Sequence, residues 1–331
     1  MAEVRVSNNK VLEGVACGIG AGALWGLVFL APELVPEFGP LHLTVGRYLF
    51  YGVFSVLLIA PLWRRVMPKL SRREWIALGW LAFAGNIFYY VLLSSAVRLG
   101  GIAMTSLVIG FLPVAVTIVG SRDQGAVPLR QLAPSLALCV LGALCIGAEA
   151  LSGATSASIV EQSAGLLCAI GALVSWTCYA VWNSRWLTKL RQVSGHEWNL
   201  LTGVMTCAQA LLLLPFALAF SDGSHSAAAW TQLAGVSAGV AVLASITGNA
   251  LWNRMSRLLP LTLVGQMILF ETLFALIYGF VWEQRLPTPL ETVAFTLVFL
   301  SVVSCLGVHR KAQSSLLDHS GGDAVASEGK S

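Results

Sequence analysis

Charge is scarce in this chain: only 11% of its 331 residues are Asp, Glu, Lys or Arg, while 56% are hydrophobic. An average soluble domain carries roughly 25% charged residues, which keep its surface hydrated. This scarcity excludes a water-soluble protein of this size. The few charges gather in short stretches between apolar runs of about 20 residues, the length that crosses a ~30 Å hydrocarbon layer as a helix. The sequence therefore predicts an all-α membrane protein.

Several chemical signatures are missing as well. The seven cysteines all fall inside apolar runs and form no Cys-x-x-Cys pair, so neither an extracellular disulfide framework nor a zinc site is expected. The sequence has no Walker segment for ATP hydrolysis, and its five histidines are scattered over span ends, loops and tail rather than clustered as metal ligands. The basic residues lie at helix ends, as membrane topology demands, which argues against a nucleic-acid partner. We expect no enzyme, no cofactor and no metal.

The apolar runs, bounded by Pro, Gly or charge, predict ten transmembrane helices. The expected spans are 11–31, 41–63, 74–96, 103–120, 132–150, 164–184, 197–219, 232–252, 260–281 and 290–309. The first run is too long for a signal-peptide core and lacks a cleavage site, so we expect it to be retained. Residues 311–331 are rich in Ser, Gly and Asp and predict a disordered tail.

The distribution of Lys and Arg predicts the orientation. Of the 20 basic residues, 17 fall in segments expected on the same side as the N-terminus, and only Arg98 and Arg285 fall on the other side. Because cytoplasmic loops are enriched in Lys and Arg, both termini are expected in the cytoplasm.

An internal repeat links the two halves of the chain. The matching residues are Gly14, Cys17, Ile19, Gly20, Ala21 and Trp25 in the first span, and Gly165, Cys168, Ile170, Gly171, Ala172 and Trp176 in the sixth, each pair 151 residues apart. Cys145 and Gly147 recur as Cys305 and Gly307, 160 residues apart. This pattern predicts two five-helix repeats, 11–150 and 163–310. Because five is odd, the repeats would cross the membrane in opposite directions, as in many secondary transporters that bind substrate at the midplane.

Three aromatic residues are candidates for a substrate site. Trp25 and Trp176 lie near the middle of their expected spans, away from the interfacial belt where tryptophan is usually found. They could form two symmetry-related walls for an uncharged ring, and Tyr179 adds a hydroxyl one turn from Trp176. The alternative is that both tryptophans simply pack helices together.

Glu271 is the acidic residue with the strongest claim to a role. It lies 11 residues into the ninth span, where an ionised carboxylate costs at least ~2.5 kcal/mol. It could bind a substrate ammonium or take up a proton during the cycle. The alternative is a protonated, structural glutamic acid hydrogen-bonded to Gln266 or to a neighbouring helix.

Other mid-span polar residues allow two interpretations. Asn86, Tyr90, Thr105 and Gln266 could bind the amino and carboxylate groups of a zwitterion. They could equally form interhelical hydrogen bonds, worth about 0.6 kcal/mol each. For Arg47 we expect snorkelling to the outer surface, or pairing with Glu33 or Glu37, rather than contact with substrate.

Two features concern helix geometry. Gly14, Gly18, Gly22 and Gly26 form a stripe that lets another helix approach closely, although Gly22 could also act as a hinge in gating. Pro113 interrupts the fourth span, and such a break is tolerated at membrane depth only beside protein or a water-filled cavity.

Arg47, the Leu112-Pro113 pair, Glu271 and the Trp-Glu-Gln-Arg-Leu run from Trp282 to Leu286 occur in an order that resembles the drug/metabolite transporter superfamily, specifically its EamA-type members. One departure is that Glu271 precedes Thr272, where family members often have proline. Trp25 and the Trp176-x-x-Tyr179 pair most resemble the YddG-type aromatic amino acid exporters of that superfamily.

The resemblance implies ten helices in two inverted five-helix repeats, located in a bacterial inner membrane. It implies secondary-active export of small metabolites, including amino acids, by alternating access, driven by protons or by the solute gradient. Two alternatives remain: a multidrug or quaternary-ammonium exporter that uses Glu271 as counter-ion, and a membrane-embedded enzyme or lipid scramblase.

Overall fold

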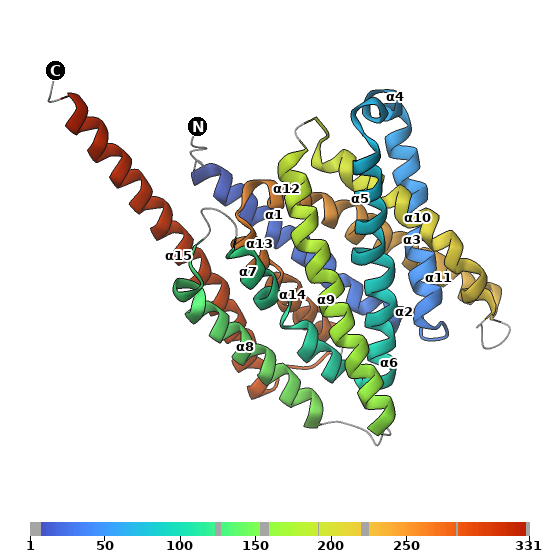
Figure 1. The fold of residues 1–331 in the computed structure, drawn as a ribbon. Helices are drawn as coiled ribbons and strands as arrows, with labels where there is room; N and C mark the ends of the chain where they lie inside the picture. Colours follow the sequence, from blue (N-terminus) through green and yellow to red (C-terminus); the bar gives the residue numbers. More distant parts are fainter. Residues whose placement is uncertain are drawn as a thin grey trace.

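The computed structural model describes residues 8–122, 127–152, 159–190, 192–219, 225–282 and 284–328. Within these ranges, side chains are not described at 8, 32–33, 97–98, 100–104, 106–107, 146–147, 149–152, 159 and 310–328. The secondary structure of the described residues is helical throughout, without strands (Figure 1).

The first half of the chain forms α1 to α8. Its elements are α1 Asn8–Gly26, η1 Leu27–Leu30, α2 Ala31–Leu34, α3 Pro40–Ile59, η2 Ala60–Leu62, α4 Trp63–Val66, η3 Met67–Lys69, α5 Arg72–Ala82, η4 Phe83–Ile87, α6 Phe88–Ile109, α7 Leu112–Gly120 and α8 Leu129–Ser152.

The second half forms α9 to α15. Its elements are α9 Ile159–Lys189, α10 Gly195–Ala219, α11 Ala227–Val240, η5 Ala241–Gly248, α12 Asn249–Leu258, α13 Leu261–Met267, α14 Leu269–Trp282 and α15 Pro289–Glu328. The last helix continues through most of the segment for which the sequence predicts a disordered tail.

Eight helical stretches of the described chain are long and apolar enough to cross a membrane. They are Asn9–Leu30, Pro40–Lys69, Arg72–Ala96, Val160–Lys189, Gly195–Ala219, Ala227–Leu258, Leu261–Trp282 and Pro289–His309. A shorter apolar helix covers Leu129–Cys145. The two remaining expected spans, 103–120 and 132–150, fall on the end of α6 with α7 and on α8.

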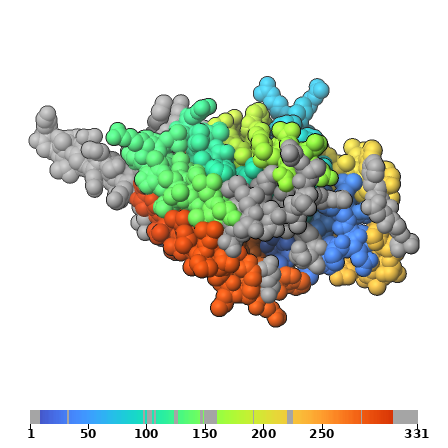
Figure 2. Space-filling model, turned by 90° about the horizontal axis from the view of Figure 1, so that it is seen from below, coloured from blue at the N-terminus to red at the C-terminus, as the bar shows by residue number. Residues whose placement is uncertain are grey.

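Helices from the two halves of the chain pack against each other throughout the bundle. The main pairs are α3 with α10, α8 with α15, α7 with α13, α6 with α9, and α1 with both α12 and α14. Figure 2 shows the green surface of α8 adjoining the orange surface of α15 along one side of the molecule. The chain halves are thus interleaved rather than separate bodies.

The contact between α3 and α10 is reciprocal. Gly52 of α3 lies against Cys207 of α10, and Gly203 of α10 lies against Ser55 of α3, so closely that a Cβ on either glycine would overlap its neighbour. Gly52 and Gly203 are separated by the repeat distance of 151 residues. A contact in which each copy offers the same patch to the other is typical of two-fold symmetry.

Two π-helical segments interrupt long helices. η4 lies between α5 and α6, and η5 lies between α11 and α12. In η4, the amide of Phe88 donates to the carbonyl of Phe83, five residues earlier. A π segment leaves carbonyls to be satisfied from outside the helix, and such segments occur frequently at functional sites.

The expected break in the fourth span and a break in the ninth both occur. α6 ends at Ile109 and α7 begins at Leu112, so Pro113 lies in the first turn of a new helix, where it sacrifices no hydrogen bond. In the ninth span, α13 ends at Met267 and α14 begins at Leu269. This second break forms without the proline that position 272 lacks.

The glycine stripe of α1 packs against α12, α13 and α14. A Cβ at Gly22 would lie 2.8 Å from the backbone nitrogen of Glu271, and one at Gly26 would lie 2.9 Å from that of Ala275. The helix runs unbroken through Gly22. Gly22 therefore permits close approach of two backbones, and no kink forms at this residue.

Candidate functional site

Five aromatic side chains meet inside the bundle; we call them the central cluster (Trp25, Tyr89, Trp176, Tyr179 and Trp252). The rings of Trp25 and Trp176 meet edge to face, with centroids 6.1 Å apart. Trp252 lies 5.0 Å from Trp25 and 5.5 Å from Trp176. Tyr179 and Tyr89 lie 5.9 and 6.4 Å from Trp176. The two tryptophans that the repeat singles out are thus brought together.

Both π segments are joined to the first helix of the opposite half. Trp25 Nε1 donates to the carbonyl of Ala244 in η5 at 3.2 Å and to Asn249 Oδ1 at 3.1 Å. Ser175 of α9 donates its hydroxyl to the carbonyl of Ala84 in η4 at 2.7 Å. These bonds join the first helix of each half to the π segment of the other half, and they position the central cluster against the two irregular segments.

The glycines of the two π-segment regions make room for the aromatic rings. Gly85 lies directly against the ring of Tyr179, and a Cβ on Gly248 would lie 2.9 Å from Trp25 Nε1. Both glycines precede an asparagine, Asn86 and Asn249. The recurring Gly-Asn pair thus occupies comparable positions in the two halves.

Glu271 lies in the first turn of α14, beside the central cluster. The carboxyl is surrounded by protein although the residue as a whole is only partly buried, and the carboxyl lies within electrostatic range of Tyr89 and Arg47. No hydrogen bond or ion pair to it is found among the described residues. The expected structural partner, Gln266, instead approaches Thr117 Oγ1 at 3.4 Å and accepts from Ser301 at 3.1 Å.

The interpretation of Arg47 as a snorkelling or outer-loop residue is wrong. Arg47 is only 8% exposed, and its Nε donates to Ser245 Oγ in η5 at 3.0 Å. Its guanidinium lies 5.2 Å from the ring centre of Tyr48 and 5.4 Å from that of Tyr90. α3 begins at Pro40 and packs against α11 and η5, so the face that carries Arg47 points into the bundle.

The expected polar residues are distributed between the site and the helix packing. Tyr90 contacts Arg47 and therefore belongs to the site. Asn86 donates to Thr206 Oγ1 at 3.0 Å, and Gln266 is fully buried among Thr117 and Ser301, so both serve interhelical hydrogen bonds. Thr105 is buried in α6 beside residues whose side chains lie outside the described set.

Several residues at this site were missed in the sequence. Trp252 was placed at the end of its span, yet α11, η5 and α12 form one continuous stretch to Leu258 that carries it inside. Asn199 donates to the carbonyls of Ser245 and Ile246 at 3.3 and 3.0 Å and accepts from Tyr51 at 2.7 Å. Asn199 lies 151 residues after Tyr48, which is the repeat distance, so the repeat could have marked it as the counterpart of a residue next to Arg47.

The end of the bundle at which α1 begins, here called the N-terminal end, is held together by polar contacts. Asn183 of α9 donates to Asn253 of α12 at 2.9 Å. Arg257 donates to the carbonyls of Leu190 and Val193 at 3.1 and 2.6 Å. These contacts tie α12 to α9 and to the segment that follows α9.

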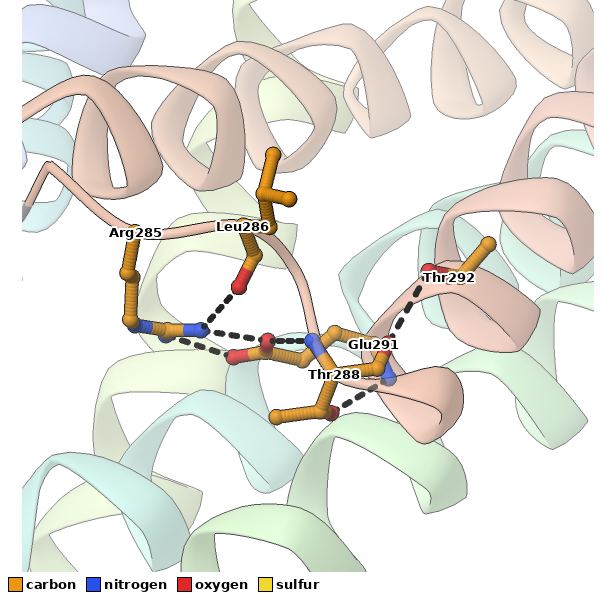
Figure 3. Close-up of polar contacts among 5 residues, drawn as sticks. All are labelled: Arg285, Leu286, Thr288, Glu291 and Thr292. Carbon is orange, nitrogen blue, oxygen red and sulfur yellow. Dashed lines mark hydrogen bonds and ion pairs between the residues drawn. The ribbon is translucent and has the colours of Figure 1, made fainter.

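The Trp282–Leu286 run leads into a compact clasp before α15 (Figure 3). Both guanidinium nitrogens Nη1 and Nη2 of Arg285 donate to Glu291, each at 2.7 Å. Glu291 also accepts from the Thr288 amide at 2.7 Å, and its own amide donates to Thr288 Oγ1 at 3.2 Å. The latter two bonds form a capping box, so Thr288 and Glu291 cap the start of the last helix, and Arg285 ties the preceding run to this cap.

Comparisons with known proteins agree with this architecture. The model of the EamA-like transporter family matches residues 12–148. The inner membrane protein YtfF of Escherichia coli (strain K12) is 31% identical over 329 residues, covering 93% of this chain and 98% of its own. One solved crystal structure aligns with 88% of this chain and 98% of its own at a TM-score of 0.66 and 20% identity, a likeness of fold alone.

Proposed function

Because the chain belongs to the EamA-like transporter family, we propose that it is a secondary-active exporter of amino acids, including aromatic ones, that works by alternating access. It is a multi-pass membrane protein whose family moves small solutes. The observation that carries the finer proposal is the meeting of Trp25 and Trp176, one from the first helix of each half, beside the carboxyl of Glu271.

The paired contacts support two inverted five-helix repeats, N-in and C-in. The bond from Ser175 to Ala84 and the bond from Trp25 to Ala244 are of the same kind, since each joins the first helix of one half to the π segment of the other half. The sequence repeat has offsets of 151 and 160. Together with the reciprocal α3–α10 contact, this correspondence supports a pseudo-two-fold axis between the halves.

The chemistry of the central cluster supports an aromatic solute. Large flat rings provide polarizable surfaces for another ring, preferring edge-to-face or offset contacts. The carboxyl of Glu271 supplies a partner for an ammonium group, and among the described residues no hydrogen bond already occupies it. Gly22 supports this arrangement because it allows α1 to approach the α14 backbone at Glu271.

One asymmetry supports alternating access. The contact of α9 with α12 at the N-terminal end would have its symmetry counterpart between α1 and α6 at the opposite end. Among the described residues, α1 and α6 form no comparable contact. With the N-terminal end in the cytoplasm, this difference supports a conformation closed to the cytoplasm and open to the other side.

Counterflow in proteoliposomes against the twenty amino acids tests the proposal. We expect exchange of tryptophan or phenylalanine, and we expect Trp176→Ala to reduce it by about 10-fold because a stacking surface is lost. Trp63→Ala, at an exposed tryptophan of α4, is the matched control and should change exchange by less than about twofold. Failure to exchange any aromatic amino acid would refute the specificity.

Replacing Glu271 with Gln tests the role of its carboxyl. The substitution preserves shape but removes charge and proton uptake, so we expect reduced transport and loss of its pH dependence. Unchanged transport with unchanged pH dependence would remove Glu271 from the mechanism.

The same rings and carboxyl would also suit a quaternary-ammonium exporter, because three tryptophans beside a carboxylate can hold a cation. Competition between tryptophan and a cationic dye in vesicles separates the two proposals. Displacement of tryptophan only by other amino acids favours the amino acid exporter.

A further inference from the structure

Arg47 is a buried cation without an ion-pair partner among the described residues. Arg47 is 8% exposed. Apart from its contacts with tyrosines, it donates from Nε to the neutral hydroxyl of Ser245 at 3.0 Å. No ion pair to Arg47 is found among the described residues. The carboxylate of Glu37, an expected partner of Arg47, approaches His225 instead, at 3.8 Å. A guanidinium withdrawn from water is stable only when a partner compensates it, so this geometry calls for an anion from elsewhere.

The surroundings of Arg47 hold the guanidinium in one orientation. The rings of Tyr48 and Tyr90 lie on it at 5.2 and 5.4 Å, and Ser245 takes its Nε. A side-chain hydrogen bond also joins Arg47 to Tyr90. The remaining N–H groups of the two terminal nitrogens can bind a carboxylate. Ser245 is itself fixed, since its carbonyl accepts from Asn199.

Arg47 and Glu271 lie within electrostatic range of each other but do not form an ion pair. They come from different elements, α3 and α14, and Tyr89 of the central cluster lies within electrostatic range of both. One cation and one carboxyl held apart beside an aromatic surface match the two charges and the ring of a zwitterion.

We propose that Arg47 binds the carboxylate of the transported solute and thereby selects carboxylate-bearing solutes over amines. This inference rests on the proposed function, because it places the solute between Arg47 and the central cluster. It assigns the ring to the tryptophans, the ammonium to Glu271 and the carboxylate to Arg47.

Binding to the purified full-length protein in detergent tests the assignment, with tryptophan and tryptamine as probes. These molecules share a ring and an ammonium, and only tryptophan has a carboxylate. A charge-assisted hydrogen-bonded contact contributes about 1.5–3 kcal/mol, which is about 10- to 100-fold in affinity. We expect the wild type to prefer tryptophan by that factor and Arg47→Gln to lose the preference by weakening tryptophan alone.

Two further variants separate binding from folding. Arg47→Lys keeps the charge without the planar fork and should retain part of the preference, and Ser245→Ala should weaken tryptophan binding modestly. Arg254→Gln is the matched control because Arg254 pairs with Glu13 at an exposed position; it should leave the preference intact. If Arg47→Gln does not fold, the Lys and Ala variants carry the test, and unchanged preference in both would refute the inference.

The outcomes distinguish this inference from the proposed function. Equal binding of tryptophan and tryptamine by the wild type, or an unchanged preference in Arg47→Gln, refutes the role of Arg47 and leaves the exporter proposal standing. Binding of other carboxylates but no amino acid, lost in Arg47→Gln, supports Arg47 and refutes the amino acid assignment. Binding only of solutes without a carboxylate, or of no solute in a panel of amino acids and simple carboxylates, refutes the inference.

Discussion

The stretch α5–η4–α6 and the stretch α11–η5–α12 both contain a π-helical segment, and different side chains bind the two segments. In each stretch a side chain from the first helix of the opposite half donates to a carbonyl of the π segment, Ser175 in one case and Trp25 in the other. η4 spans 5 residues and η5 spans 8. Within the second stretch, the hydroxyl of Ser245 accepts a hydrogen bond from Arg47, and its carbonyl accepts one from Asn199. The two stretches thus share a backbone irregularity and differ in the side chains that bind it.

The glycines facing the aromatic rings should give the largest difference between the two stretches. Gly85→Ala would drive a methyl group into the Tyr179 ring, and we expect it to destabilise the protein by about 2–3 kcal/mol, the upper range for overpacking. Gly248→Ala meets only the edge of Trp25 and should cost about 1 kcal/mol. Equilibrium unfolding in mixed micelles measures both.

Gly235→Ala on α11 is the control for these substitutions, because a Cβ there has no neighbour within 4 Å. It should be neutral or slightly stabilising, since alanine favours the helix. Equal effects at Gly85 and Gly235 would show that η4 does not depend on close contact with the ring.

Substitutions of Trp25 and Ser175, which donate to the carbonyls of Ala244 and Ala84, should have the next largest effects on stability. Trp25→Phe leaves both the Ala244 carbonyl and the Asn249 amide oxygen without the indole N–H, so we expect a loss of about 2 kcal/mol. Ser175→Ala removes a single hydroxyl and should cost about 1 kcal/mol. A larger loss for Ser175→Ala would reverse the ranking of the two π segments.

Asn199 gives η5 additional hydrogen bonds, because it donates to the carbonyls of Ser245 and Ile246. Asn199→Ala removes two donor contacts to η5, and we expect a loss of about 1 kcal/mol together with weaker solute binding, because Ser245 would no longer be fixed beside Arg47. Tyr48→Phe removes the corresponding 3.4 Å bond to the Asn86 carbonyl and should cost less. Binding isotherms alongside unfolding curves separate the two effects.

The smallest effect is expected at Asn86. Thr206→Val removes the acceptor for its amide while keeping the shape of the side chain, and a single interhelical hydrogen bond contributes about 0.6 kcal/mol. Transport should remain at the wild-type rate. A loss of transport with little loss of stability would return Asn86 to the solute site.

Eight of the ten expected spans correspond to helices that are long and apolar enough to cross a membrane, because the length of an apolar run can be read directly from the sequence. The proximity of Trp25 and Trp176 followed from the repeat, which marks symmetry-related positions. The rotation of side chains about each helix was less accessible. Each π segment adds a residue to a turn, so residues after it, such as Trp252, point to a face that a 3.6-residue period does not predict. The expectation for Arg47 fails for a related reason. Its distance along α3 from the helix end does not determine which face of the helix it occupies, and that face points into the bundle.

The mutual fit of Gly52 with Cys207 and of Gly203 with Ser55 has a consequence for motion. A point on the proposed two-fold axis between the halves is its own image, so under the proposed alternating access an exchange of conformations between the halves would leave that point in place. We therefore expect the crossing of α3 and α10 to stay in place during such a conformational change, while the displacement of each helix increases with distance from the crossing. Spectroscopic probes placed near this crossing should stay stationary through the cycle, while probes at the helix ends should report its full amplitude.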